Sequence, residues 1–446
     1  MTRHAAIDLG ASSGRVVVAD VTSESLSLRE VHRFPNGPVQ QPDGLHWDVD
    51  RLHQEVLSGL RQMGRVESIG IDSWAVDYGL LASSGELLNQ PWCYRDSRTD
   101  GVQLSLSREV LFARNGLQHL PFTTAYQLAV EDRLEAASSV LLIPDLLTYW
   151  LTGEIGSEVT NASTTGLLDA TTRTWSPEVL AAVGVSEAQL GPLVQPGTPR
   201  GSFHGVDVIA VGSHDTASAF VGAPLTSNRS VCISLGTWGL VGLELADPIL
   251  TEGVRAANVT NELGVDGRVR FLRNVPGLWL LQECLREWGG GADLLELLLE
   301  EAADIPAQVP FDLDDDALLA PGDMPARLTA HIAACGLRPA RRRAHLVRYI
   351  LDSLAEALAS TVEVVTALAS VEPDVVHVVG GGARNALLCR LLAQRTGLVV
   401  LAGPVEATAV GNALVQARAV GTLSGGLEDL RQLVRRTTEV VRYEPS

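Results

Sequence analysis

An acid and an imidazole stand side by side in the stretch VGSHDTASAF, residues 211–220, where an apolar strand meets small helix-forming residues. Two hypotheses are open for this junction. Ser213 or Asp215 could cap the helix, because short polar side chains accept hydrogen bonds from the free N–H groups of a first turn. Alternatively, the carboxylate of Asp215 could act as a base in catalysis, with His214 beside it.

A second candidate site is the turn between two apolar strands in AAIDLGASSGRVVVADV, residues 5–21. Its Gly and Ser residues would expose backbone N–H groups to a phosphate, and the hydroxyls of Ser12 and Ser13 add donors. Asp8 ends a hydrophobic strand and would suit a Mg²⁺ ion that carries phosphates, usually through water. The alternative is an ordinary hairpin whose glycines supply positive φ angles.

The second half of the chain opens on a similar turn. Residues 233–239 read ISLGTWG and share the Ile-x-Leu-Gly core of residues 7–10, with Thr237 near the tip. Because each copy opens one half of the chain, the match favours an internal duplication. Two such turns that faced one another across a cleft would hold a triphosphate from both sides.

Two further motifs have a functional and a structural explanation of similar weight. GGGARN, residues 380–385, follows a strand and opens a helix, so it could present amides to an anion or serve only as a tight turn. GIDSWAVDYG, residues 70–79, places Asp72 and Asp77 around Trp74. Acids beside an aromatic ring suit sugar hydroxyls, which makes Asp77 a substrate-binding candidate, although a polar hairpin face would explain both acids as well.

The charged residues exclude several classes of function. The net charge of −19 opposes binding to nucleic acid, since a phosphate backbone would be repelled. The chain contains no lysine, which excludes a P-loop, a pyridoxal enzyme and a Schiff-base aldolase. A nucleotide would therefore be held by backbone amides, hydroxyls, arginine and a metal ion.

The cysteines and apolar segments predict a cytoplasmic protein. The five cysteines are widely spaced and never form CxxC, which is typical of reduced and mostly buried thiols. The histidines form no HxxH or HExxH pair, so a zinc site is not expected. The apolar runs are broken by charge or proline, and the first strand follows Met1 too closely for a signal peptide, so no membrane association is expected.

The periodicity of the chain predicts an α/β fold in two parts. Strands are expected at 26–34, 66–72 and 206–211, and helices at 49–63, 124–136, 144–152, 277–288 and 345–369. The segment 374–421 alternates strand, helix, strand and helix, which indicates parallel strands covered by helices. Residues 223–230, APLTSNRS, are the expected linker.

These motifs together resemble the FGGY carbohydrate kinases, from residue 5 to about residue 420, and within that family the branch that acts on L-rhamnulose. The segments that carry the resemblance are DLGASSGR (8–15), GIDSWAVDYGLL (70–81), SHDTASA (213–219), SLGTW (234–238), VVGGGARN (378–385) and AGPVEATAVGN (402–412). Any one of them alone would indicate only the wider kinase family.

The resemblance implies duplicated actin-like (ribonuclease H-like) α/β domains with ATP in the cleft between them. Residues 1–224 would form the domain with the sugar site, the first phosphate turn and the catalytic acid, and residues 225–446 the nucleotide-binding domain. The implied reaction transfers the γ-phosphoryl group of ATP, with Mg²⁺, to the 1-hydroxyl of L-rhamnulose. The alternatives are a kinase for L-fuculose, D-xylulose or L-ribulose, or a non-enzymatic actin-like ATPase. A monomer or a homodimer is expected.

The resemblance also implies roles for individual residues. The implied nucleotide contacts are Ala11, Ser12, Ser13, Gly14, Arg15, Thr237, Gln282 and Gly382. The implied sugar contacts are Ala75, His214, Asp215, Thr216 and Asn274, with Asp215 as the catalytic base and Asp8 as the metal ligand. Ala75 stands where the family usually has glycine, so the fit of the sugar at that position is an open question.

Overall fold

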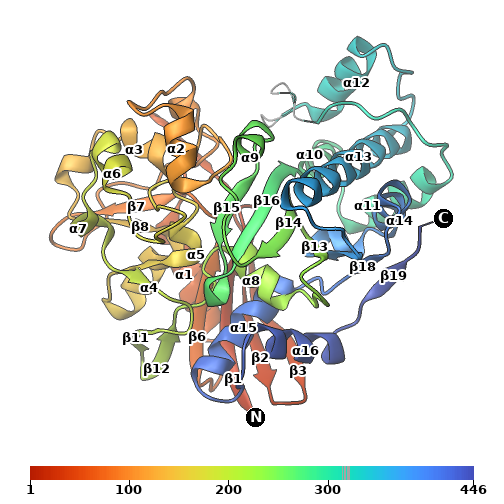
Figure 1. The fold of residues 1–446 in the computed structure, drawn as a ribbon. Helices are drawn as coiled ribbons and strands as arrows, with labels where there is room; N and C mark the ends of the chain where they lie inside the picture. Colours follow the sequence, from red (N-terminus) through yellow and green to blue (C-terminus); the bar gives the residue numbers. More distant parts are fainter. Residues whose placement is uncertain (314, 316–317, 319–321, 446) are drawn as a thin grey trace. The chain divides into compact units, whose positions relative to one another are not determined.

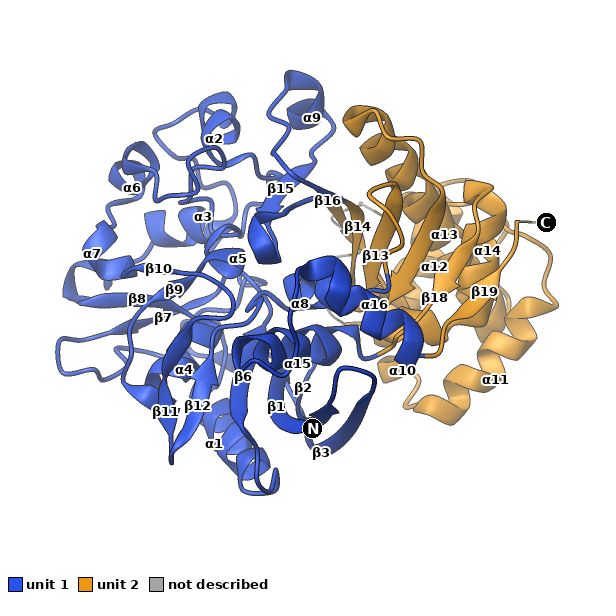
Figure 2. Ribbon diagram, turned by 60° about the horizontal axis from the view of Figure 1, so that its bottom comes forward, with its two compact units in different colours: residues 1–224, 244–271, 406–438 blue, residues 225–243, 272–405, 439–446 orange. Residues whose placement is uncertain are grey.

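The computed structural model describes residues 1–313, 315, 318 and 322–445 and divides the chain into two compact units (Figure 2). Unit 1 consists of residues 1–224, 244–271 and 406–438, and unit 2 of residues 225–243, 272–405 and 439–446. The chain therefore enters unit 2 after Pro224 and returns to unit 1 twice, at residues 244–271 and 406–438. The assignment of sugar binding and nucleotide binding to residues 1–224 and 225–446 stays a prediction.

The main sheet of unit 1 has the strand order β11-β12-β6-β1-β2-β3 (Figure 1). Its strands are β1 (Thr2–Leu9), β2 (Ser13–Val21), β3 (Leu26–Pro35), β6 (Ser68–Ser73), β11 (Pro199–Phe203) and β12 (Val206–Ile209). The first three strands pair antiparallel, whereas β6 is parallel to both β1 and β12. Three short pairs complete the strands of this part: β4 (Val39–Gln41) with β5 (Gly44–His46), β7 (Tyr78–Leu81) with β8 (Ser139–Leu142), and β9 (Ser157–Glu158) with β10 (Leu193–Val194).

The sheet of unit 2 repeats the arrangement around its first strand. Its strands are β13 (Ser230–Leu235), β14 (Trp238–Leu245), β17 (Val375–Val379), β18 (Val400–Ala402) and β19 (Val441–Tyr443), with β16 (Val269–Pro276) next to β14. Like β1, β13 pairs antiparallel with the next strand of the chain and parallel with a later one, β17. This shared topology supports the internal duplication that the two Ile-x-Leu-Gly turns indicate. β15 (Thr260–Leu263) and the start of β16 belong to unit 1.

The helices cover both units. Those of unit 1 are α1 (Val49–Leu60), α2 (Arg108–Asn115), α3 (Thr124–Ala129), α4 (Ile143–Thr152), α5 (Val159–Ala162), α6 (Pro177–Val183), α7 (Glu187–Leu190), α8 (Asp215–Gly222), α9 (Glu252–Ala256), α15 (Ala407–Ala419) and α16 (Leu427–Thr437). Those of unit 2 are α10 (Trp279–Glu287), α11 (Ala292–Ala303), α12 (Met324–Ala334), α13 (Arg343–Ala369) and α14 (Ala386–Thr396). The apolar periodicity of residues 345–369 is confirmed as the long helix α13.

The helix expected at 124–136 is wrong in its length. α3 ends at Ala129, because Val130 leaves the helical backbone with φ −116° and ψ 13°. The next residue, Glu131, uses its carboxylate to accept hydrogen bonds from Tyr78 Oη (3.1 Å) and Arg98 Nη1 (3.2 Å). This tertiary ion pair overrides the local helical pattern, which resumes only as a short 3₁₀ turn at Leu134–Ala136.

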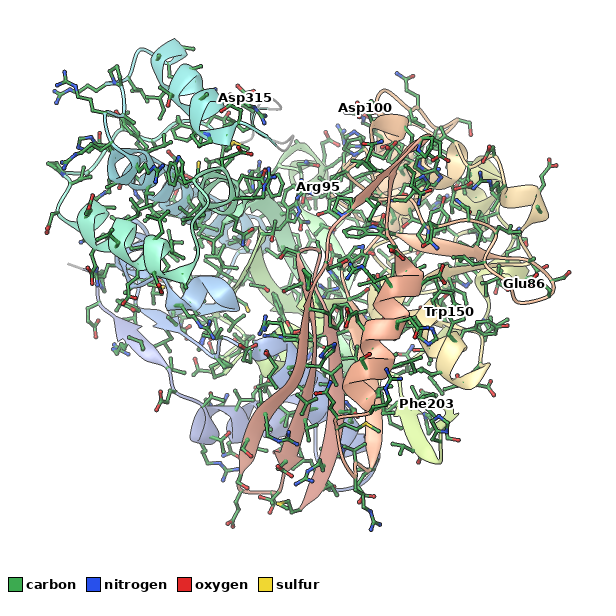
Figure 3. All side chains as sticks on the ribbon, turned by 180° about the vertical axis from the view of Figure 1, so that it is seen from behind. Glu86, Arg95, Asp100, Trp150, Phe203 and Asp315 are labelled. Atoms are coloured by element: carbon green, nitrogen blue, oxygen red, sulfur yellow. The ribbon has the colours of Figure 1, made fainter. Side chains whose placement is uncertain are left out.

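The two faces of the unit 1 sheet carry different helices, because successive strand residues point to opposite faces. Ile7 belongs to a buried apolar cluster with residues of α1 and α4. On this face, the ring centroids of Trp150 in α4 and His53 in α1 lie 5.0 Å apart; Figure 3 labels Trp150. Ala6 packs against Ala409 of α15 on the other face. Asp8 shares the face of Ala6 and therefore points toward the α15 side.

α8 and α15 cross at a pair of glycines. A Cβ atom at Gly222 would lie 2.0 Å from the carbonyl oxygen of Ala407, and one at Gly411 would lie 1.8 Å from that of Ser218. No side chain fits in such a gap, so both positions require glycine for the close approach of the two backbones. This crossing fixes how far α8 and its first residue, Asp215, stand from α15.

We predict that Gly411→Ala destabilises the protein by about 1–3 kcal/mol, because the added methyl group overpacks a backbone contact. Chemical denaturation with a fluorescence or circular dichroism readout measures this change. Gly37→Ala is the matched control, since a Cβ atom at Gly37 would meet nothing within 4 Å. Equal stability of the two variants would contradict the close crossing.

Candidate active site

The register of three strands places Asp8 between an arginine and a second acid. Asp8 of β1 lies opposite Arg15 of β2 and opposite Asp72 of β6, so the three side chains share one face of the sheet. Arg15 donates to Asp8 Oδ2 from Nε (2.9 Å) and from Nη2 (2.5 Å), and also pairs with Glu406 at the start of α15. The turn that the sequence predicts for phosphate binding is therefore tied at its base to two carboxylates.

Asp72 is the most deeply buried carboxyl of this group. It has no exposed surface, its Oδ2 accepts a hydrogen bond from Asn412 Nδ2 (2.5 Å), and its Oδ1 has no hydrogen-bond partner. Burial raises its pKa well above the usual value, and the nearby charges of Asp8 and Asp215 raise it further. Asp8, Asp72 and Asp215 thus form one electrostatically coupled set within unit 1.

The turn of residues 10–14 is closed by backbone bonds. Gly10 N donates to Ser13 O (2.9 Å), and Asn36 Nδ2 donates to Gly10 O (2.8 Å). The alternative in which the glycines supply positive φ angles is wrong, because neither Gly10 nor Gly14 has one. Gly14 is needed for packing instead, since a Cβ atom there would lie 2.3 Å from the Phe34 ring.

The junction of residues 213–216 begins α8, but neither of the two proposed residues caps it. His214 occupies the cap position in an extended conformation and makes no side-chain cap bond, while Asp215 is the first helical residue. Ser213 instead donates from its N (3.0 Å) and its Oγ (2.7 Å) to Glu158 Oε2. The capping hypothesis is therefore wrong, because the buried Glu158 engages the serine hydroxyl.

His214 is oriented by a buried ion pair behind it. Arg270 Nη1 lies 3.0 Å from Glu262 Oε2 and donates to His214 Nδ1 (3.1 Å). Nδ1 also lies 3.4 Å from Glu262 Oε2, so both members of the ion pair contact this edge of the ring. At the opposite edge, Nε2 lies 3.4 Å from Oδ1 of Asp215, the candidate base.

The carboxylate of Asp215 keeps about 30% of its surface exposed although it stands at the rim of a buried set. Burial raises its pKa; His214 opposes this effect, and the charge of Asp8 adds to it. A helix N-terminus favours a carboxylate anion, but here it does not outweigh these effects. A raised pKa makes the carboxylate a better proton acceptor.

Ala75 and Asp77 flank a strained turn. Asp77 N donates to Ala75 O (2.9 Å), which makes Val76 the centre of a γ-turn, and Val76 has a φ of 68° that a β-branched residue rarely adopts. The Asp77 carboxylate accepts four hydrogen bonds, from Trp47 Nε1, Trp74 Nε1, Tyr94 N and Gln127 Nε2. These bonds hold the turn, while burial raises the pKa of Asp77 to about 6.

In unit 2, three of the predicted nucleotide residues gather at the end of β13. Thr237 Oγ1 donates to Gln282 Oε1 (3.2 Å), and a Cβ atom at Gly382 would lie 2.4 Å from the Leu235 side chain. Asn274 lies on β16 of the same unit and is partly exposed. The structure thus gathers the predicted residues into two sets, one in each unit: Asp8, Ala11–Arg15, Ala75, Asp77 and His214–Thr216 in unit 1, and Thr237, Asn274, Gln282 and Gly382 in unit 2.

Glu158 and Arg270 are two site residues that the sequence does not single out. Glu158 caps α5, accepts hydrogen bonds from Thr160 and Asn161, and holds Ser213 beside His214. Burial raises its pKa to about 7. Neither residue belongs to a motif or a periodic pattern, so only the tertiary structure reveals their contact with the junction of residues 213–216.

Other chemistry-bearing groups are few in the part of the chain that the structure describes. There, no cluster of three His, Cys, Asp or Glu side chains is arranged to hold a metal directly, and no helix is long and apolar enough to cross a membrane. All five cysteines are free, and four are buried: Cys93, Cys232, Cys284 and Cys389. A pocket of about 300 Å³ in unit 1, between α2, α3 and α9, contains none of the predicted site residues in its lining.

The chain belongs to the FGGY family of carbohydrate kinases. Residues 4–222 match the N-terminal domain of this family and residues 231–420 match its C-terminal domain. The resemblance inferred from the motifs is therefore confirmed, and the protein is a carbohydrate kinase, an enzyme class that uses a nucleotide as a substrate.

Related proteins align with almost the whole chain. Rhamnulokinase of Bacteroides thetaiotaomicron is 36% identical, with 99% of this chain and 95% of that protein covered. Rhamnulokinase of Pectobacterium carotovorum is 42% identical, with 99% and 92% covered.

Solved structures share the fold. A ligand-bound xylulose kinase from Lactobacillus acidophilus matches with a TM-score of 0.78 at 14% identity, covering 100% of this chain and 94% of that one. Plasmodium falciparum glycerol kinase with ADP matches with a TM-score of 0.76 at 16% identity, covering 100% and 95%. The predicted two-domain α/β fold of a sugar kinase is confirmed.

We predict that Glu158→Gln lowers both stability and turnover. One amide oxygen cannot replace two carboxylate oxygens toward Thr160, Asn161 and Ser213, so a buried donor loses its partner at a cost of about 1–3 kcal/mol. Denaturation curves and kcat measure the two effects. Glu154→Gln, at an exposed glutamate, is the control. If both variants behaved alike, Glu158 would not position the junction.

Proposed function

We propose that this protein transfers the γ-phosphoryl group of ATP to the 1-hydroxyl of L-rhamnulose, giving L-rhamnulose 1-phosphate and ADP. The observation that carries the proposal is the alignment of 99% of the chain with rhamnulokinases at 36% and 42% identity. The position of Asp215, at a helix start beside an oriented histidine, supports a base for the acceptor hydroxyl.

In this proposal the predicted residues form a nucleotide-binding group and a sugar-binding group. The backbone amides and hydroxyls of Ala11–Arg15, together with Thr237, Gln282 and Gly382, bind the nucleotide. His214, Thr216 and Asn274 bind the sugar, and the Ala75 and Asp77 turn forms one wall of its site. The strained backbone at Val76 supports this role, because strain is retained where the surroundings fix a functional geometry.

Asp215 accepts the proton of the attacking hydroxyl. The sugar oxygen forms a bond to the γ-phosphorus, the bond from that phosphorus to the bridging oxygen breaks, and ADP leaves with the electron pair. Because the transition state of phosphoryl transfer is loose, the proton moves late and positioning contributes most of the catalysis. Nε2 of His214, 3.4 Å from Oδ1 of Asp215, keeps the carboxylate oriented for this step.

The residues around Asp8 fit the Mg²⁺ ion that phosphoryl transfer requires. Asp8 and Asp72 supply hard oxygen atoms, and Oδ1 of Asp72 is a buried carboxylate oxygen without a partner. Asp8 would hold the ion, directly or through water. When bound, Mg²⁺ neutralises charge on the transferred phosphoryl group.

We also propose a cytoplasmic location and a monomeric or homodimeric state, with small molecules as partners. The net charge of −19 supports the absence of a nucleic-acid partner. Light scattering after size exclusion measures the oligomeric state.

A coupled ADP-release assay over several ketoses tests the proposed substrate. We expect the highest kcat/KM with L-rhamnulose, and lower values with L-fuculose, D-xylulose and L-ribulose. Asp215→Asn should lower kcat by about 10²- to 10⁴-fold, as loss of a general base does, while ADP binding persists. A higher kcat/KM for another ketose would reassign the substrate, and ATP hydrolysis unaffected by any ketose would favour an actin-like ATPase.

The raised pKa of Asp215 predicts an acidic limb in the pH profile. The base works only when ionised, so kcat/KM should fall as pH is lowered through a pKa above the usual 3.8. Circular dichroism at each pH separates this loss from unfolding. A rate that is independent of pH until the protein unfolds would contradict Asp215 as the base.

A further inference from the structure

A continuous chain of buried hydrogen bonds leads from the edge of unit 1 to Asp72. It connects side chains of β1, β6 and α15, which contact one another along their lengths (Figure 1). The members, in order from the edge, are Thr422, Thr2, His4, Ser68, Gln416, Asn412 and Asp72, with separations of 2.7, 2.8, 2.9, 2.7, 2.6 and 2.5 Å. Each member finds a hydrogen-bond partner in this way, as buried polar groups in proteins generally do.

One backbone carbonyl sets the direction of this chain. Gln416 Nε2 donates to Ala5 O (3.0 Å), and a carbonyl can only accept, so the Gln416 amide has one orientation. Its Nε2 then also donates to Asn412 Oδ1, which leaves Asn412 Nδ2 to donate to Asp72. From Gln416 onward, each side chain therefore donates a hydrogen bond to the next one, and the last bond goes to the carboxylate of Asp72.

The upstream members agree with this direction. Gln416 Oε1 accepts from the Ser68 hydroxyl, so Ser68 Oγ accepts in turn from His4 Nδ1. His4 then carries one proton on Nδ1 and accepts from Thr2 at Nε2. Burial lowers the pKa of His4 to about 4, which matches a neutral ring with one N–H.

Gly70 of β6 leaves room for the side-chain amides of Asn412 and Gln416 where they approach the sheet. A Cβ atom at Gly70 of β6 would lie 2.5 Å from Asn412 Oδ1 and 2.7 Å from Gln416 Nε2. Gly411 allows close contact on the other side, because a Cβ atom there would lie 1.8 Å from the carbonyl oxygen of Ser218 in α8. Asn412 is therefore held by close contacts on two sides, and its donor is fixed on Asp72 Oδ2.

The fixed bond at Oδ2 leaves the other oxygen of Asp72 unsatisfied. Oδ1 is shielded from solvent and has no partner, while the guanidinium of Arg15 pairs with Asp8 and Glu406 and acts on Asp72 only through its charge. A buried carboxylate without full compensation is costly, and a cation nearby offsets that cost. Charges in a buried setting are also weakly screened, so the charge of Asp72 acts on a nearby cation without direct ligation.

We propose that Asp72 is a positioning residue for the divalent cation of the bound nucleotide, and that Asn412 and Gln416 hold its carboxylate for this role. The inference rests on the proposed function as a Mg²⁺-dependent kinase. It assigns to α15, a helix from the C-terminal part of the chain, a role in the phosphoryl-transfer centre of unit 1.

Asp72→Asn separates charge from shape. The asparagine oxygen still accepts from Asn412, so the melting temperature should stay close to that of the parent. We expect the affinity for Mn²⁺ in the presence of ADP, measured by electron paramagnetic resonance of free Mn²⁺, to fall about tenfold. KM for MgATP should rise by a similar factor with little change in kcat. Asp20→Asn, at the Arg3 ion pair of β2, is the matched control.

An exchange variant distinguishes positioning from a structural role. Asp72→Asn combined with Asn412→Asp keeps a hydrogen bond between the two positions but moves the charge to α15. We expect the parent melting temperature and a weakened Mn²⁺ affinity. Recovery of both would overturn the proposal, because the bond alone would then suffice.

Gln416→Leu tests the chain behind Asn412. Loss of the Gln416 donor frees the Asn412 amide to rotate, so Mn²⁺ affinity should fall, whereas Gln62→Leu at the exposed end of α1 should not change it. An unchanged affinity in Gln416→Leu would remove Asn412 and Gln416 from the proposal.

The assay also separates this inference from the proposed function. Mn²⁺ binding with ADP is measured without sugar, so it does not depend on which ketose is the substrate. If the parent bound no Mn²⁺ with ADP, the proposed kinase function would fail together with the inference. If the parent bound and Asp72→Asn bound equally well, only the inference would fail.

Discussion

The register of β1 with its two neighbours is the constraint on which the rest of the site depends. It places Asp8 opposite both Arg15 and Asp72, and a slip of one residue would turn all three side chains to the other face. That other face is filled by the apolar cluster with α1 and α4, where an acid would find no partner. Burial of Ile7 in that cluster therefore also fixes where the acids point.

The helices on the acidic face complete what the strands begin. Gly222 and Gly411 let α8 and α15 approach to backbone contact, and α15 is the helix that supplies Asn412. Asp215 at the first turn of α8 is thereby placed within the field of Asp8, whose charge raises the pKa of Asp215. The acidic residues come from segments that are distant in the sequence, and the two glycines allow the helices that carry or support them to pack closely.

The sequence indicates the reactive residues better than it indicates their supports. The strand–turn–strand of residues 5–21 and the periodicity of residues 345–369 are local patterns, and both are observed. The resemblance to the kinase family assigns roles to Asp8 and Asp215 through the motifs that contain them, and these roles stay predictions. The sequence does not reveal Glu158 and Arg270, because a buried acid and its donors become neighbours only after folding.

The end of α3 shows the same limit at the level of secondary structure. Its local pattern is helical through residue 136, but Glu131 forms its ion pair with Arg98 and the helix stops before it. A long-range contact of this kind outweighs the small differences in helix propensity on which a local prediction rests. The tautomer of His4 and the amide orientation of Gln416 also cannot be predicted from the sequence. Both follow from the hydrogen bond that Gln416 donates to the carbonyl of Ala5.

The internal duplication is unequal in its chemistry. Asp8 and Asp72 are register partners in unit 1, and the corresponding partners in unit 2 are Ser234 and Val379. The second copy thus keeps the strand pairing but carries neither carboxylate at these two positions. Its turn offers a hydroxyl at Thr237 and a closely packed glycine at 382, groups that suit a neutral or anionic ligand. The two units therefore share a topology but not the charge at the strand ends, because the fold fixes these positions and leaves their charge free to differ.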